Sequence, residues 1–300
     1  MVLAFYMRLR YRRSESHANR VFIDCSRQMS SKVLVNGHRF ASFRLILCLV
    51  ALLPTLVLAP LPAQAKEASK PSLLVAAAAS LTDAVQSLKP LIEHRLGVTV
   101  RFDLAGTPTL VRQIENGAPI DVLLAADEAS MDDLQTRKLI APQTRHDVAR
   151  NTLVLVVPAG APAGLIKAPA DLDKPAVHRF ALCNAAVPAG HYARQLLTHL
   201  GLLKTLHNKI VESDNVRAAL AQVVSGAVQA GFVYATDAAA AHHQVRVVYT
   251  ADAAQSIDVR YPAAALRASK HPKQAAQLVE LLTSLEAQKK LTALGFKAIR

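Results

Sequence analysis

The chain has 300 residues, a formal net charge of +13 and no tryptophan. Residues 1–65 hold nine Lys or Arg against two Asp or Glu, which leaves 26 basic and 20 acidic residues after them, a net charge of only +6. The chain after residue 65 therefore lacks the clustered basic charge of a nucleic-acid-binding protein, and its few aromatic residues offer little surface for base stacking.

Residues 1–65 have the pattern of an N-terminal extension that ends in a cleavable signal peptide. Arg39 and Arg44 precede an apolar run over 45–61, and the run ends in the small-residue pattern at 62–65 that is typical of a cleavage site. Two prolines interrupt this run, which is also short for a membrane anchor. We therefore expect cleavage after Ala65 and a periplasmic mature protein. Only one of the three cysteines, Cys183, follows this segment, so we expect a buried thiol and no internal disulfide.

After the leader, short apolar runs alternate with longer helical patterns. The first series predicts strands and helices in turn, over 73–77, 81–95, 98–104, 109–116, 121–125 and 127–138. Such strict alternation is typical of a mostly parallel sheet with helices on both faces. Ligands of such sheets bind at the carboxyl ends of the strands.

A second series begins at residue 152 and is interrupted by the Pro- and Ala-rich segment 158–169, which we expect to be a surface loop. It predicts strands over 152–157, 180–183, 231–234, 245–249 and 259–264, and helices over 189–200, 216–225 and, in more than one piece, 272–294. The fold class that we expect is α/β with two similar lobes, each a mostly parallel sheet flanked by helices. We assign residues 66–149 and 251–300 to lobe I and residues 150–250 to lobe II.

The most informative corner between a strand and a helix is VAAAASLTDA at 75–84. Ser80 followed three residues later by Asp83 predicts a capping box at the start of the next helix. Free N–H groups at a helix start carry partial positive charge, so this corner is a candidate oxyanion site. Most Ser caps only close their own helix, and the interpretation depends on whether similar corners join it.

Four further positions supply donors of the same kind. Thr107 follows Gly106 and can cap a helix whose first position is Pro108. Ala189 begins a helix after a Val-Pro pair, and Val216 follows the capping cluster at 213–215. Tyr234 ends a strand and carries a phenolic donor.

At these positions the chain resembles the periplasmic molybdate-binding proteins of ABC importers, from about residue 73 to the C-terminus. The resemblance is carried, in family order, by AAAASLTDA (76–84), TLVRQIENGAPIDVLLAAD (109–127), VPAGHYA (187–193), DNVRAALAQV (214–223) and GFVYATDA (231–238). It implies a type II periplasmic binding protein that closes its two lobes on a tetrahedral oxyanion and delivers it to a membrane permease. We expect this protein to be a monomer.

The resemblance also assigns the ligand-binding residues one by one. The Ser that binds through its hydroxyl and N–H corresponds to Ser80, and the second hydroxyl residue to Thr107. Backbone donors fall on Ala189 and Val216, and the binding Tyr on Tyr234. The chain departs from the family pattern where Pro108 replaces the usual Ser, which removes an N–H at the edge of the pocket.

These five groups are all donors, with no Lys, Arg or carboxylate among them. A pocket of donors alone suits a fully deprotonated dianion, because a protonated phosphate needs an acceptor for its own O–H. Molybdate, tungstate and sulfate all satisfy this condition, and the resemblance favours molybdate, then tungstate. We expect the molybdenum to be held only as the oxyanion, with no residue coordinating a metal ion and no cofactor.

The main alternatives are the same scaffold binding another oxyanion such as sulfate and, with less support, an exported α/β hydrolase. Ser80 with His191 or His94 could form a nucleophile and base, but the nucleophile-elbow motif is absent. Asp121 and Asp127 are interpreted as a turn anchor and a helix cap. The adjacent histidines His242 and His243 are interpreted as part of a solvated turn. Arg217 is interpreted as a surface or interlobe residue.

Overall fold

The computed structural model describes residues 70–252 and 257–299. The chain divides after Ala65 into two units, and the described residues all belong to the second. The predicted signal peptide and its cleavage site lie outside the described residues. In the described part, no helix is both long and apolar enough to cross a bilayer.

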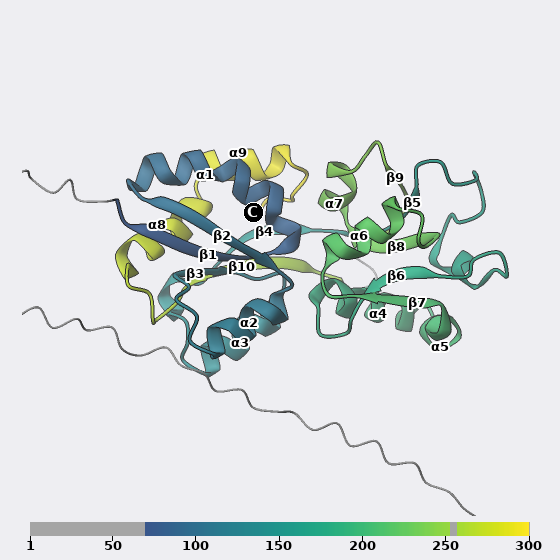
Figure 1. Ribbon diagram of the computed structural model, residues 1–300, viewed down its shortest axis with the longest axis horizontal. Helices are drawn as coiled ribbons and strands as arrows, with labels where there is room; N and C mark the ends of the chain where they lie inside the picture. Colours follow the sequence, from purple (N-terminus) through teal and green to yellow (C-terminus); the bar gives the residue numbers. More distant parts are fainter. Residues whose placement is uncertain (1–69, 253–256, 300) are drawn as a thin grey trace, which may run out of the picture. The chain divides into compact units, whose positions relative to one another are not determined.

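Two five-stranded sheets organise the described residues (Figure 1). Sheet 1 has the order β2-β1-β3-β10-β4 and sheet 2 the order β7-β6-β8-β5-β9. The strands of sheet 1 are β1 (Ser72–Ala78), β2 (Thr99–Ala105), β3 (Val122–Leu124), β4 (His146–Asn151) and β10 (Val259–Ala265). The strands of sheet 2 are β5 (Leu153–Pro158), β6 (Phe180–Cys183), β7 (Ile210–Ser213), β8 (Ala230–Tyr234) and β9 (Val245–Thr250).

Each sheet contains one strand that runs against the others. In sheet 1, β1 pairs in parallel with β2 and β3, while β10 is antiparallel to both of its neighbours. In sheet 2, β6 is parallel to β7 and β8, while β5 is antiparallel to β8 and β9. The expected mostly parallel, two-lobed α/β class is therefore confirmed. The chain passes from sheet 1 to sheet 2 between Asn151 and Leu153, and it returns between Thr250 and Val259.

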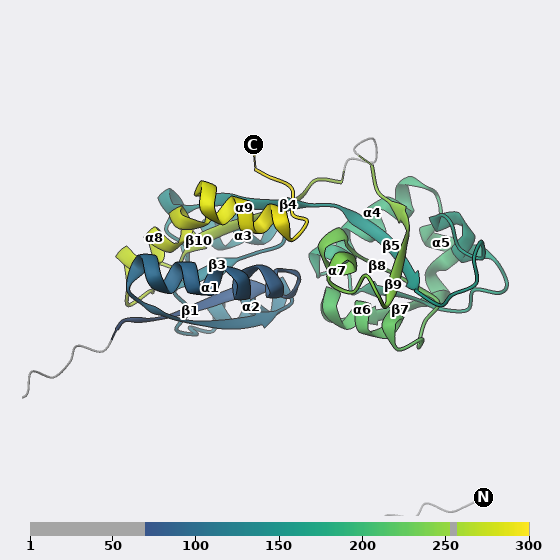
Figure 2. The ribbon, with the colours of Figure 1, turned by 90° about the horizontal axis from the view of Figure 1, so that it is seen from above.

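Helices cover both faces of each sheet (Figures 1 and 2). Those of sheet 1 are α1 (Thr82–Leu96), α2 (Thr107–Glu115), α3 (Glu128–Thr136), α8 (Pro272–Leu282) and α9 (Leu285–Ala293). Those of sheet 2 are α4 (Pro188–His199), α5 (Leu203–Leu206), α6 (Val216–Val224) and α7 (Ala235–Ala240). Short 3-10 turns are η1 (Ala79–Leu81), η2 (Pro142–Thr144), η3 (Pro169–Asp173) and η4 (His207–Lys209).

Strand β1 shows how one apolar run serves two cores. Leu73, Val75 and Ala77 pack in the cluster that includes α1, α8 and α9. Ala76 packs on the other face, in the cluster formed with α2 and α3. Because successive strand residues point to opposite faces, a strand covered on both sides must be apolar throughout, which explains the unbroken VAAAA run.

Two edge strands, β4 and β7, were not predicted. The sequence of β4, HDVARN, carries polar side chains, and β10 is its only neighbouring strand in sheet 1, although Arg150 also forms an isolated bridge with Lys297. The short β7, IVES, pairs only with β6. Edge strands have one free side and tolerate polar residues, so they lack the apolar pattern that identifies a central strand.

Candidate functional site

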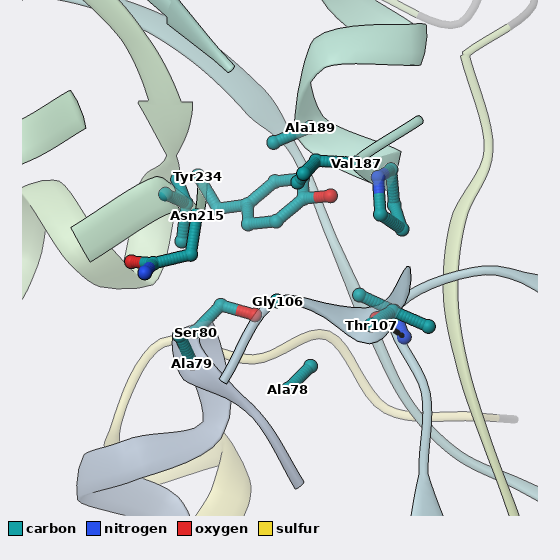
Figure 3. Close-up of a pocket in the computed structure, with 12 residues that line it drawn as sticks. Ala78, Ala79, Ser80, Gly106, Thr107, Val187, Ala189, Asn215 and Tyr234 are labelled. Carbon is teal, nitrogen blue, oxygen red and sulfur yellow. Dashed lines mark hydrogen bonds between the residues drawn. The ribbon is translucent and has the colours of Figure 1, made fainter. Parts of the chain in front are cut away.

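A small pocket lies where the carboxyl ends of strands from both sheets meet (Figure 3). It has about 220 Å³ of empty space, which includes space open to solvent. All five predicted site residues line it, namely Ser80, Thr107, Ala189, Val216 and Tyr234. The first two follow strands of sheet 1, and the other three belong to segments of sheet 2. The expected position at the strand ends is therefore observed.

Ser80 is presented by a 3-10 turn and not by a helix cap. It is the middle residue of η1, and α1 begins only at Thr82, with no side-chain cap. The predicted capping box of Ser80 and Asp83 is wrong, because the chain leaves β1 through a tight turn before the helix starts. Ser80 is 3% exposed, and its Oγ accepts a hydrogen bond from the hydroxyl of Tyr261 at 3.1 Å. Its own hydrogen is therefore left for another acceptor.

Thr107 has a similar arrangement of its hydroxyl. The predicted capping role is wrong, since Gly106 is the N-cap of α2, Thr107 is the first helical residue and Pro108 the second. The Thr107 Oγ1 accepts a hydrogen bond from the N–H of Ala126 at 3.2 Å, and the residue is 1% exposed. Because this lone pair is occupied by the main chain, the hydroxyl hydrogen is available to a ligand.

The two predicted backbone donors lie in first turns of helices. Ala189 is the second residue of α4, after Pro188, which has no N–H. Val216 is the first residue of α6, where the Asn215 side chain accepts a hydrogen bond from Ala218 N at 3.0 Å. The first N–H groups of a helix have no intrahelical acceptor, so the N–H groups of Ala189 and Val216 are available at the pocket. In Figure 3 the Asn215 amide is turned away from the hydroxyl of Tyr234.

Tyr234 supplies the third hydroxyl. It ends β8, is 1% exposed, and its Oη has no hydrogen-bond partner although it is buried. Figure 3 shows this hydroxyl and that of Ser80 both directed into the space between the two sets of segments. Burial raises the pKa of the Tyr234 phenol well above its usual value, so it stays neutral and can donate. A buried phenol without a partner is costly unless a ligand accepts its hydrogen bond.

Charged side chains stand outside this pocket. None of the described residues that line it is Lys, Arg, Asp or Glu. Arg217, next to Val216, is an interlobe residue as predicted, since its Nη2 lies 2.6 Å from Asp83 Oδ2 in α1. Its Nε lies 2.8 Å from Oδ1 of Asp237 in α7. Burial nevertheless raises the pKa of Asp237 to about 7. Arg217 therefore has two acidic partners outside the pocket, and the donors facing the pocket are neutral.

The two carboxylates weighed for catalysis have structural roles. Asp127 accepts a hydrogen bond from Ser130 N and caps α3, as predicted. Asp121 accepts hydrogen bonds from Leu74 N at 2.8 Å and Ser269 Oγ at 2.6 Å, which ties β1 to the turn after β10. His191 is exposed on α4. The group hydrogen-bonded to Ser80 is a phenol, so the geometry beside it is not that of a nucleophile with an imidazole base.

Two other predictions concern thiols and metals. Cys183 is buried as expected, and burial raises the pKa of its thiol to about 12, which leaves it protonated. The adjacent histidines His242 and His243 are exposed in the turn after α7, as expected. In the segments 70–252 and 257–299, no three or more His, Cys, Asp or Glu side chains are grouped to hold a metal ion.

Sequence reasoning missed the groups that stand behind the pocket. Asn151 and Tyr261 are buried, and they connect the end of β4 and the middle of β10 to Ser80. Tyr261 and Ser80 are 181 positions apart, so no local spacing relates them. The only signal was a tyrosine within an apolar strand, and that signal does not distinguish a hydrogen-bonded hydroxyl from a packed ring.

Comparisons with known proteins agree with this architecture. Residues 73–297 match the family of bacterial extracellular solute-binding proteins. Over 206 residues the chain is 35% identical to the molybdate-binding protein ModA of Escherichia coli (strain K12), covering 66% of this chain and 78% of that protein. The fold is similar to that of the periplasmic molybdate-binding protein of Azotobacter vinelandii, with 26% identity, a TM-score of 0.68, and coverage of 76% and 100% of the two chains.

A sulfate-binding protein has a comparable fold. The protein SubI of Mycobacterium tuberculosis H37Rv matches with a TM-score of 0.68 and 17% identity, covering 76% of this chain and 87% of that one. At this identity the likeness concerns the fold alone. The fold is thus shared by proteins with different oxyanion ligands, and the choice among ligands depends on the pocket.

Proposed function

Since the chain belongs to the family of bacterial extracellular solute-binding proteins, we propose that it captures molybdate in this pocket and delivers it to the permease of an ABC importer. The observation that carries the proposal is the convergence of neutral donors from both sheets around a buried Tyr234 hydroxyl that has no partner. We assign ligand binding to Ser80, Thr107, Ala189, Val216 and Tyr234.

The chemistry of the donors supports a dianion without bound protons. The Ser80 hydroxyl accepts a hydrogen bond from Tyr261, and the Thr107 hydroxyl accepts one from the N–H of Ala126. Each hydroxyl therefore has its own hydrogen left to donate to a ligand. An oxyanion that still carries a proton would place an O–H against these donors, where it finds no acceptor. Molybdate and tungstate fit this requirement at neutral pH. The absence of a facing cation also avoids a tight charge pair, which suits a protein that must release its cargo.

The domain organisation that we propose follows from this mode of capture. Lobe I corresponds to residues 66–149 and 251–300 and lobe II to residues 150–250, with the first crossover moved to just after Asn151, where β4 of sheet 1 ends. The ligand is held between the two lobes. Export by the leader at 1–65 and a periplasmic location complete the proposal, and the protein acts as a monomer. Sulfate is the second candidate ligand, because it meets the same requirement for a dianion and a protein with this fold binds it.

Thermal unfolding of the purified protein in the presence of four oxyanions tests the proposed function. A ligand at 100 times its Kd stabilises the fold by about 2.7 kcal/mol, which shifts the melting temperature measurably. We expect molybdate and tungstate to raise the melting temperature and hydrogen phosphate to leave it unchanged. A shift with sulfate and none with molybdate would replace our ligand with the second candidate, and no shift with any oxyanion would refute oxyanion capture.

Removal of single hydroxyl donors tests the assignment of the site. Ser80→Ala and Tyr234→Phe should each weaken molybdate binding by roughly 1 to 3 kcal/mol, since each removes a hydrogen bond to a buried charge. Isothermal titration gives the affinities, with Tyr249→Phe as a matched control on β9, outside the lining of the pocket. If both variants bind as tightly as the unmodified protein, these hydroxyls are not ligands.

A further inference from the structure

A buried chain of hydrogen bonds leads from the end of β4 to Ser80. The Thr152 N–H donates to Asn151 Oδ1 at 2.8 Å, and Asn151 Nδ2 donates to Tyr261 Oη at 3.2 Å. Tyr261 Oη in turn donates to Ser80 Oγ at 3.1 Å. The side chains that form these hydrogen bonds are almost inaccessible to solvent, with exposed fractions of 6% for Asn151, 0% for Tyr261 and 3% for Ser80.

The direction of every bond in this chain follows from its first member. A backbone N–H can only donate, so the Asn151 atom that faces Thr152 must be the amide oxygen. The amide nitrogen then faces Tyr261, and it also donates to Thr236 Oγ1 at 2.9 Å. Since an NH₂ group can only donate, Tyr261 Oη must accept from it and has its own hydrogen left for Ser80.

The ring of Tyr261 is held in place independently of its hydroxyl. It makes edge contacts with Tyr234, at 6.0 Å between ring centroids, and with Phe296, at 5.6 Å. Aromatic pairs at these distances and near-perpendicular angles are favourable. Loss of the hydroxyl alone therefore leaves the packing of the ring intact, which makes the hydrogen bond separable from the core.

We infer that Tyr261, oriented by Asn151, is a specificity-determining positioning residue that makes Ser80 an obligate donor to the ligand. The inference rests on the proposed function and deepens it. With Tyr261 donating to its Oγ, Ser80 must direct its hydrogen toward the pocket. An oxyanion that carries a proton meets this hydrogen with its own O–H and is rejected. Without the Tyr261 hydroxyl, Ser80 can rotate and accept a hydrogen bond from such a ligand.

Two tetrahedral dianions of similar size test this inference. At pH 8 selenate carries no proton and arsenate carries one, so the ratio of their dissociation constants measures rejection of the proton with little contribution from size. Competition against molybdate, followed by isothermal titration, gives this ratio. In Tyr261→Phe we expect the arsenate-to-selenate ratio of Kd values to fall about tenfold or more, the effect of one hydrogen bond to a charged group. In Tyr249→Phe the ratio should not change.

The Ser80→Ala variant provides a second background, which distinguishes a positioning role of the Tyr261 hydroxyl from a packing role. In Ser80→Ala, which has no hydroxyl to orient, adding Tyr261→Phe should leave the ratio unchanged. Equal weakening of selenate and arsenate in Tyr261→Phe, with the ratio preserved, would overturn the inference and leave the capture of molybdate standing. If the unmodified protein binds no oxyanion, both the inference and the proposed function fail. If Tyr261→Phe does not fold, Asn151→Leu replaces it. This variant removes the donor to Tyr261 Oη, so that the Tyr261 hydroxyl can accept a hydrogen bond from Ser80, and the arsenate-to-selenate ratio should fall as it does in Tyr261→Phe.

Discussion

Gly190→Ala is expected to lower both the stability of the ligand-free protein and its affinity for molybdate. Gly190 lies in the first turn of α4, and a Cβ built on it falls within contact distance of the Asn184 and Cys183 carbonyl oxygens, and 2.7 Å from Cys183 C. These are backbone atoms at the end of β6, and they cannot rotate away. Helix α4 must therefore shift off the sheet and carry the Ala189 N–H with it.

The expected magnitude is that of a severe overpacking in a core. We expect Gly190→Ala to lose about 3 kcal/mol of unfolding free energy, measured by urea denaturation without ligand. Gly160→Ala is the matched control, because a Cβ at Gly160 meets no atom within 4 Å. An unchanged midpoint for Gly190→Ala together with unchanged binding would mean that α4 does not pack against β6 as described.

Gly106→Ala should impair binding and spare the fold. Gly106 is the N-cap of α2 with φ −63° and ψ 140°, a conformation that alanine adopts without strain. The added Cβ would lie 2.5 Å from the carbonyl oxygen of Asp214, which precedes α6. These residues belong to segments of different sheets, so separation of the lobes relieves the clash without disturbing either core.

Gly106→Ala should therefore differ from Gly190→Ala in stability, while both variants lose affinity for molybdate. We expect the urea midpoint of ligand-free Gly106→Ala to stay near that of the unmodified protein, and the Kd for molybdate to rise roughly tenfold or more, at about 1.4 kcal/mol for each factor of ten. Unchanged affinity would show that the Gly106 and Asp214 segments need not approach each other when the ligand is bound. A large loss of stability would show that the contact is part of the fold in the absence of ligand.

The sequence was sufficient to place the donors but not to describe how they are held. Short-range patterns predicted the strand ends that carry Ser80 and Tyr234, because buried strands and helix starts have local signatures. The predicted roles of Ser80 and Thr107 as helix caps were wrong. A 3-10 turn precedes α1 at Ser80, and α2 begins one residue earlier than predicted, at Thr107. A shift of one or two residues in a helix start changes which residue is the cap, and sequence patterns do not locate helix starts that closely.

Long-range hydrogen bonds were beyond the reach of the sequence for a different reason. Tyr261 reaches Ser80 only because β10 returns to sheet 1 from the far end of the chain and pairs between β3 and β4. Likewise, β4 carries Asn151 at its end but has the polar sequence of an edge strand, so neither the strand nor the role of its last residue was predicted. The orientation of a hydroxyl is a property of the assembled core.

The structure of the protein crystallised with molybdate tests the central claim most directly. Anomalous scattering from molybdenum locates the ligand without reference to the protein model. We expect one molybdate in the pocket, with its oxygens within hydrogen-bond distance of Ser80 Oγ, Thr107 Oγ1, Tyr234 Oη and the N–H groups of Ala189 and Val216. Molybdenum located elsewhere, or held in this pocket by a charged side chain, would contradict capture by neutral donors.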